Sequence, residues 1–162
     1  MINIKIMCVG KIKDKNLFSL ISEYQKRISK YAKLDIIEVD DEKISQNISD
    51  LDIKNVKEKE CNKILEKINK LNKPYVIALD LKGKNFSSVE FSQKIESISV
   101  NGFSTVIFII GGSLGISDEL LNKCNDKFCF SSLTFPHQLI RLFLCEQIFR
   151  AFKIINNETY HH

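Results

Sequence analysis

Apolar and polar positions follow two periods along this chain, one of about two residues and one of about 3.6 residues. Short alternating or unbroken apolar stretches predict strands. These strands cover residues 2–9, 34–39, 75–81, 105–110 and 127–131. Apolar residues at helical spacing predict helices. These helices cover residues 17–31, 56–71, 87–101, a short segment from 117, and 136–155. The polar, irregular segment 40–54 is expected to be a solvated loop.

The regular alternation of strands and helices predicts an α/β fold with a parallel sheet. Residues 76–79 are apolar at successive positions, which is typical of a strand that helices cover on both faces. No repeat, low-complexity segment or linker interrupts the order. We therefore expect a single domain that spans residues 1–162.

The charge balance is mildly basic, with a net charge of +4. Such a charge permits an anionic partner such as RNA without requiring one. No apolar run approaches the roughly 20 residues that span a bilayer, so no membrane association is expected. The first residues alternate like a strand and lack the layout of a signal peptide, so we expect a cytoplasmic protein.

The five cysteines are expected to be buried free thiols. They form no C-x-x-C pair, and most of them lie in apolar stretches. The histidines that could complete a metal site are only His137, His161 and His162, so no metal site is predicted. Unpaired thiols fit a reducing cytoplasm.

Unusual residues follow three of the predicted strands, at the edge where open α/β sheets bind ligands. They are Leu79-Asp80 with Gly83-Lys84, the run Gly111-Gly112-Ser113-Leu114-Gly115, and the segment from Phe130 to His137. The glycine spacing matches neither the dinucleotide fingerprint nor a phosphate-binding loop, which disfavours nicotinamide-dependent oxidation and nucleoside triphosphate hydrolysis. Adjacent glycines let a ligand approach the backbone closely, but taken alone they are better read as a simple turn.

The end of the chain favours a ligand site more strongly. Residues 131–136 form a hydroxyl-rich, non-helical segment, which can offer backbone groups to the edges of a flat heterocycle. The predicted helix 136–155 is apolar nearly all round. Such a helix must be covered on every side, so we expect its own sheet and a second copy of the chain to cover it.

The chain resembles the ribosomal RNA large subunit methyltransferase H family, of the SPOUT class. The resemblance runs from Val9-Gly10-Lys11 to the last residues and is specific only in combination. Its motifs are Ala78-Leu79-Asp80, Gly83-Lys84, Ile110-Gly111-Gly112-Ser113-Leu114-Gly115, Ser132-Leu133-Thr134-Phe135-Pro136-His137-Gln138, Arg141, Glu146-Gln147, Arg150-Ala151 and Tyr160-His161.

This resemblance implies a parallel-sheet α/β fold with a C-terminal trefoil knot, in about residues 75–155, although knots are rare. It also implies a homodimer that transfers a methyl group from S-adenosylmethionine to N3 of a pseudouridine in large-subunit 23S ribosomal RNA. Carried over residue by residue, the cofactor-binding residues are Leu79, Gly111, Phe130, Ser131, Ser132, Leu133, Thr134 and Phe135.

Methylation of N3 requires loss of the imide proton, so a base and cationic donors are expected near the acceptor. The catalytic candidates are His137, Arg141, Tyr160 and His161. His137 begins a helix, where the dipole favours the neutral imidazole, although loop packing explains it equally well. Arg141 could bind an RNA phosphate or base edge. Tyr160 and His161 could reach the site of a partner subunit, with Tyr160 stacking on a flipped base.

Other interpretations stay open at this point. Glu146 and Arg150 are four residues apart, which favours a plain ion pair within the helix. The same scaffold could be a non-catalytic module that binds RNA or the ribosome, or a knotted methyltransferase that acts on transfer RNA. The chain leaves little surface for sequence readout, so we expect it to act on the assembled ribosome rather than on naked RNA.

Overall fold

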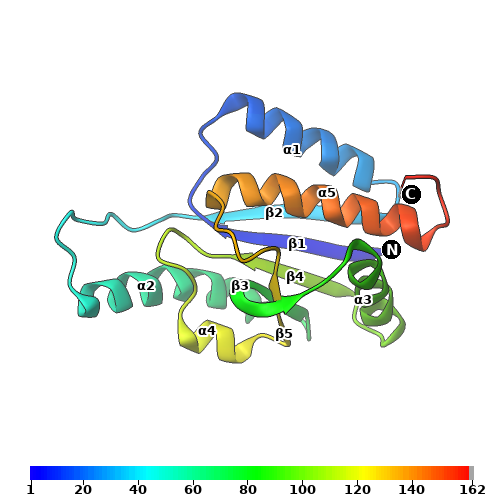
Figure 1. Ribbon diagram of the computed structural model, residues 1–162. Coiled ribbons are helices and arrows are strands. Elements are labelled where there is room, and N and C mark those ends of the chain that lie inside the picture. Colours follow the sequence, from blue (N-terminus) through cyan, green and yellow to red (C-terminus); the bar gives the residue numbers. More distant parts are fainter. Residues whose placement is uncertain (161–162) are drawn as a thin grey trace.

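The computed structural model describes residues 1–160. Five parallel strands form one sheet in the order β2-β1-β4-β3-β5 (Figure 1). The strands are β1 (Ile2–Val9), β2 (Ala32–Val39), β3 (Tyr75–Asn85), β4 (Thr105–Ile110) and β5 (Asp126–Cys129). The helices are α1 (Lys15–Ile28), α2 (Asp50–Ile68), α3 (Ser88–Val100), α4 (Asp118–Lys123) and α5 (His137–Ile155). The parallel α/β prediction is confirmed.

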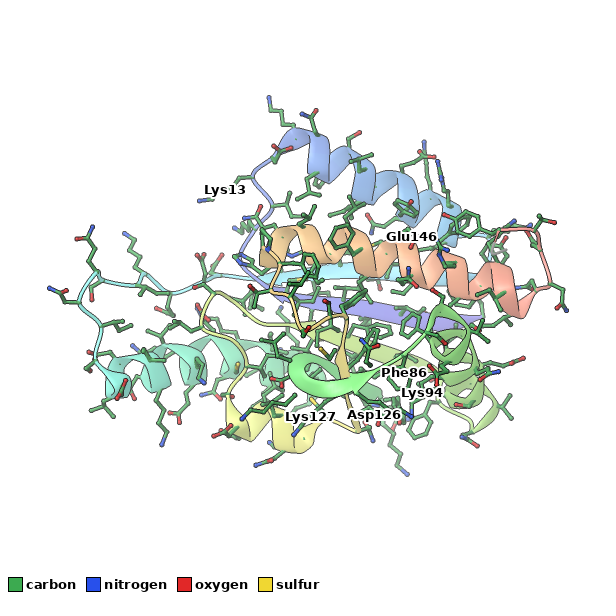
Figure 2. All side chains as sticks on the ribbon, in the orientation of Figure 1. Lys13, Phe86, Lys94, Asp126, Lys127 and Glu146 are labelled. Carbon is green, nitrogen blue, oxygen red and sulfur yellow. The ribbon has the colours of Figure 1, made fainter. Side chains whose placement is uncertain are left out.

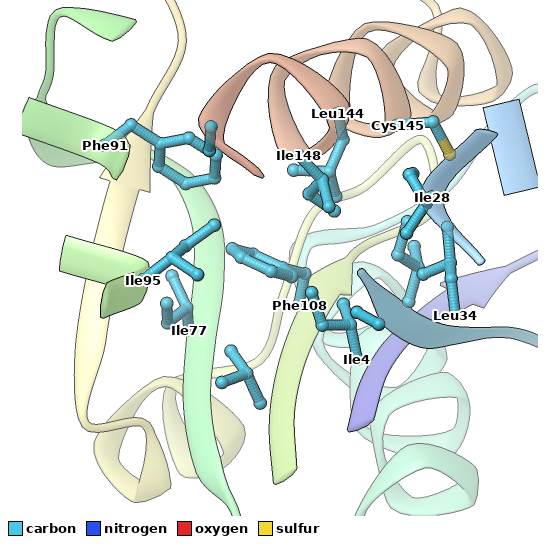
Figure 3. Packing of buried hydrophobic residues seen from close by; sticks show 14 of the residues in the cluster. Ile4, Ile28, Leu34, Ile77, Phe91, Ile95, Phe108, Leu144, Cys145 and Ile148 are labelled. Carbon is cyan, nitrogen blue, oxygen red and sulfur yellow. The ribbon is translucent and has the colours of Figure 1, made fainter. Parts of the chain in front are cut away.

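Helices α1, α3 and α5 cover one face of the sheet. The inward side chains of the central strands, such as Ile4 and Phe108, pack there against Ile28, Ile95 and Ile148 of these helices (Figure 3). Each of these five side chains is buried to within about one per cent of completely. Burial of this kind contributes on the order of 2 kcal/mol for each large apolar side chain.

Helices α2 and α4 cover the opposite face, below the sheet in Figure 1. Because strand side chains alternate, Met7 and Ile107 point to this face while their neighbours point to the other. They pack against Cys61 and Ile64 of α2 and Leu120 of α4. Both faces of β1 and β4 are therefore buried, which explains their nearly continuous apolar sequence.

Two boundaries differ by four or more residues from those that the sequence predicts. Residues 50–54 are not part of a loop, since α2 begins at Asp50. The Ser49 hydroxyl accepts from the Asp52 N–H, and the Asp52 carboxylate accepts from the Ser49 N–H, which forms a capping box with aspartate in place of glutamate. Strand β3 continues to Asn85 rather than Leu81, because its pairing with β5 resumes after a bulge.

Polar contacts fix the edge of the sheet. Lys94 of α3 forms an ion pair with Asp126 at the start of β5, 2.5 Å between Nζ and Oδ2 (Figure 2). The Tyr75 hydroxyl donates to the same carboxylate. These two contacts join the beginning of strand β5 to both β3 and α3.

The cysteines are free, and all but Cys124 are buried. Burial raises the pKa of both Cys8 and Cys145 to about 12, so these thiols stay protonated at neutral pH. The prediction of buried free thiols is confirmed. Within residues 1–160, no helix has the length and apolar character needed to cross a membrane.

Candidate active site

A pocket of about 390 Å³ opens at the carboxyl edge of the sheet. Three segments meet there: the end of β3, the turn after β4 and the segment between β5 and α5. Its walls are mainly apolar. The lining residues are Leu79, Asp80, Leu81, Lys82, Ile110, Gly111, Gly112, Gly115, Ile116, Phe128, Cys129, Phe130, Ser131, Leu133, Thr134, Phe135, His137 and Ile140. All of the predicted cofactor-binding residues line this pocket except Ser132, whose side chain is exposed outside it.

The glycine loop, residues 111–115, turns back on itself at the pocket wall. The Gly115 N–H donates to the Gly112 carbonyl over 3.0 Å, and Gly115 adopts a φ of +88°. A Cβ at Gly111 would lie 2.8 Å from the Gly115 carbonyl carbon and 2.9 Å from Ile116 Cγ1. Taken alone, the adjacent glycines favoured a simple turn over the close approach of a ligand, and the structure shows that the loop itself leaves no room for a side chain at Gly111.

The segment after β5 presents apolar side chains to the pocket and to solvent. Leu133 is 69% exposed and Phe135 is 39% exposed, although both are large and apolar. The Ser131 hydroxyl accepts from the Leu133 N–H, which fixes this turn, and the Phe135 ring packs edge-on against Phe143 of α5 at 5.6 Å. These exposed walls suit an apolar, flat ligand better than they suit water.

The bulge in β3 supplies a wall that the sequence did not reveal. Between Leu79 and Lys84, which both pair with Phe128, the chain bulges outward and places Asp80, Leu81 and Lys82 at the pocket. A Cβ at Gly83 would lie 2.6 Å from the β5 backbone, so only glycine permits this approach. The Gly83-Lys84 pair was visible in the sequence, but its contact with β5 depends on strand order and could not be read from it.

His137 lies at the pocket as the first residue of α5. Burial lowers its pKa, the neighbouring Arg141 lowers it further, and Asp41 acts in the opposite direction. A Cβ at Gly10 would lie 3.7 Å from His137 Nε2 and 4.0 Å from the Asp41 carboxyl carbon, so His137 and Asp41 approach Gly10 together. The imidazole is therefore neutral at neutral pH and next to a ligand pocket, as a general base requires.

The side chain of Arg141, the second catalytic candidate, is completely buried. Nη1 donates to Glu38 Oε1 over 3.0 Å, and Nη2 donates to the carbonyls of Val9 and Gly10 over 2.9 and 2.8 Å. The predicted contact with an RNA phosphate or base edge would require this group to leave the core. Arg141 instead holds the end of β1, beside His137.

Tyr160 lies at the other end of α5. Its hydroxyl donates to Glu146 Oε1 over 3.1 Å, its ring packs edge-on against Phe149, and the Arg150 guanidinium lies 5.1 Å from the ring centre. Within one chain, Tyr160 thus folds back on its own helix rather than reaching outward. The predicted ion pair between Arg150 and Glu146 is present at 2.8 Å. His161 lies outside the described residues.

A family model described as "Predicted SPOUT methyltransferase" matches residues 2–161. Curated relatives match over nearly their whole length. The chain is 54% identical to ribosomal RNA large subunit methyltransferase H of Clostridium botulinum (strain Kyoto, Type A2) over 159 residues, which cover 98% of this chain and 99% of the relative. The protein of the same name from Clostridium acetobutylicum is 51% identical over the same coverage. This chain belongs to the ribosomal RNA large subunit methyltransferase H family.

Solved structures agree with the fold of this family. A probable methylase family protein from Haemophilus influenzae aligns with a TM-score of 0.56 and 12% identity, over 98% of this chain and 70% of that one. A tRNA (m1G37) methyltransferase from Aquifex aeolicus aligns with a TM-score of 0.52 and 12% identity, over 91% and 69%. As a member of the methyltransferase H family, the chain has the knotted α/β fold of the SPOUT class.

Proposed function

We propose that this chain transfers the methyl group of S-adenosylmethionine to N3 of a pseudouridine in 23S ribosomal RNA of the large subunit. The observation that carries this proposal is the apolar pocket at the glycine loop, with the neutral His137 at its wall. The curated relatives named ribosomal RNA large subunit methyltransferase H support the choice of reaction and substrate.

The residues of the pocket fit the cofactor. Leu79, Leu133 and Phe135 can cover the two faces of an adenine ring, and backbone groups of the glycine loop and of residues 131–134 can bind its polar edges. A pocket of about 390 Å³ lies within the range typical of small-molecule sites. When bound, S-adenosylmethionine supplies an electrophilic methyl group.

His137 is the proposed base for the N3 proton of the acceptor. Its depressed pKa keeps Nε2 or Nδ1 free to accept a proton at neutral pH. Arg141 holds the neighbouring Val9 and Gly10 carbonyls in place, and its buried positive charge disfavours the imidazolium. Accurate positioning of the reacting groups accounts for much of the rate acceleration in such an in-line displacement. The rigid contacts around His137 therefore contribute directly to the rate.

The proposed working form is a homodimer that acts on the assembled ribosome in the cytoplasm. The exposed apolar side chains Leu133, Phe135 and Phe143 lie on or beside the segment that joins the pocket to α5, where a second copy could cover them. Light scattering at micromolar concentration should give the mass of a dimer, and a monomer mass would refute this part. We also propose that residues of about 75–155 form the knot.

A methylation assay with labelled S-adenosylmethionine tests the function. Wild type and His137→Gln are compared on assembled ribosomes, isolated large subunits and free ribosomal RNA, each lacking the modification. We expect transfer by the wild type to the large-subunit RNA of ribosomes, and a much slower rate for His137→Gln. No transfer to any of these substrates, with cofactor binding retained, would favour a non-catalytic module instead.

A further inference from the structure

Glu60 of α2 is an acidic side chain buried in the core beneath the pocket. Only 2% of the residue is exposed. Its Oε1 accepts from the Glu42 N–H over 3.0 Å, whereas Oε2 has no hydrogen-bond partner among the described residues. A buried carboxyl with a free oxygen costs stability. Its presence therefore calls for a function beyond packing.

The free oxygen points at the glycine loop. A Cβ at Gly112 would lie 2.9 Å from Glu60 Oε2 and 3.1 Å from Val9 Cγ1. Real Cβ atoms almost never approach this closely, so Glu60 and Gly112 must fit each other. Gly112 lines the pocket, whereas Glu60 does not, so any effect of Glu60 on the pocket must pass through the loop.

The other carboxylate oxygen of Glu60, Oε1, accepts a hydrogen bond from a second part of the site. Residues 40–42 follow β2 and carry Asp41, whose carboxyl group lies on the same side of Gly10 as His137. Lys63, one turn after Glu60, donates to the Asp40 carbonyl and to the Glu42 carboxylate, both over 2.9 Å. Two neighbouring side chains of α2 therefore anchor the segment that places Asp41 beside the proposed base.

We infer that Glu60 is a positioning residue that couples the two halves of the active site. Its Oε2 packs against Gly112 of the glycine loop, and its Oε1 accepts a hydrogen bond from the segment that carries Asp41. This inference rests on the proposed function, because it assigns the two halves to cofactor and acceptor. Contacts that support the residues lining a site determine how accurately that site holds its reacting groups.

Three α2 variants separate this role from general packing. Glu60→Ala removes both contacts and should raise the KM for S-adenosylmethionine and lower kcat, each by about tenfold. Glu60→Gln keeps the size of the side chain and an oxygen that can accept from the Glu42 N–H, so it should recover most of both losses. Glu66→Gln, on the exposed side of the same helix, is the matched control and should behave like wild type.

Two measurements do not depend on turnover. In the free protein, Glu60→Ala should speed amide hydrogen exchange at residues 40–42 and 111–115 more than elsewhere in α2 and the sheet. Calorimetry should show that Gly112→Ala weakens S-adenosylmethionine binding by about tenfold. Adding Glu60→Asp, which is one methylene shorter, should restore part of that affinity because it makes room for the new methyl group.

Independent effects of Gly112→Ala and Glu60→Asp would overturn the inference. Equal losses in Glu60→Gln and Glu60→Ala, or faster exchange spread evenly over the chain, would also overturn it. If wild type itself neither binds S-adenosylmethionine nor methylates ribosomes, the proposed function fails. If wild type does both and the Glu60 variants match Glu66→Gln, the function stands and the coupling role of Glu60 fails.

Discussion

The two ends of α5 hold their polar side chains in opposite ways. At the first end, Arg141 is completely buried and bonds to Glu38, Val9 and Gly10, which lie more than a hundred residues away in the sequence. From the middle of the helix onward, Glu146, Arg150 and Tyr160 of the following tail form a partly exposed cluster of local contacts.

The contrast separates a rigid end from an adaptable one. Long-range contacts to the ends of the central strands give the first end little freedom, which suits a site that must hold a cofactor and a base accurately. Local contacts such as an i, i+4 ion pair stabilise a helix by only about 0.3–0.5 kcal/mol. The second end can therefore rearrange at low cost when a substrate or a second subunit arrives.

The first prediction concerns stability. Arg141→Met should lower the free energy of unfolding by about 3 kcal/mol, because it leaves a carboxylate and two buried carbonyls without their donor. Urea denaturation of Arg141→Met and Arg150→Met, compared with wild type, measures the difference. The Arg150 variant should lose about 1 kcal/mol or less. Equal losses would remove the distinction between the two ends.

The second prediction concerns the loop that faces the rigid end. Gly111→Ala places a Cβ against the Gly115 backbone, so the glycine loop must shift, and S-adenosylmethionine affinity should fall by at least about tenfold. Gly102→Asn is the control, since Gly102 has open space around it and asparagine tolerates its positive φ. Calorimetry that shows unchanged affinity in a folded Gly111 variant would contradict the assignment of the pocket.

A third test removes the adaptable end. Deleting residues from Tyr160 onward should leave S-adenosylmethionine affinity nearly unchanged, because Glu146, the partner of Tyr160, lies about 13 Å along the helix from His137. Methylation of ribosomes should nevertheless fall by about tenfold if the tail contacts the RNA or the partner subunit. A truncated protein that works at the full rate would show that the cluster around Glu146 is structural.

The smallest expected effect is a change in the titration of His137. Because burial and Arg141 lower its pKa, the neutral imidazole persists at pH values below the ordinary histidine value of about 6.5, and activity should fall only under more acidic conditions. Asp41→Asn removes the charge that favours the imidazolium, so it should lower this pKa further. NMR titration of the imidazole measures both values, and a rise in Asp41→Asn would contradict the arrangement.

The sequence was most informative where structure depends on nearby residues. The spacing of Glu146 and Arg150 predicted their ion pair, and the apolar periods predicted the strands and helices of the sheet. The burial of Arg141 could not be predicted, because its partner Glu38 lies 103 residues away. Glu60 was missed for the same reason, since nothing local distinguishes it from the exposed acidic residues of α2.

Some residues of the site were visible as motifs while their physical roles were not. Gly111 was recognised, but its close contact with Gly115 depends on how the loop closes. Leu79 and Leu133 were named as pocket residues only through the family resemblance, because an apolar leucine in the sequence equally suits the core. The bulge at residues 80–83 could not be predicted, because it depends on β3 lying next to β5. Only the pairing of strands in the folded sheet determines that neighbour.

The reactivity of the buried thiols during refolding can report when each face of the sheet is covered. Cys145 of α5 and Cys8 of β1 are buried between α5 and the sheet, whereas Cys61 of α2 is buried on the other face of the sheet. A thiol reagent added at intervals during refolding would therefore time two separate closures. In a knotted chain, the layer beneath α5 forms only once the last segment has been threaded, so Cys145 should stay reactive after Cys61 has become protected.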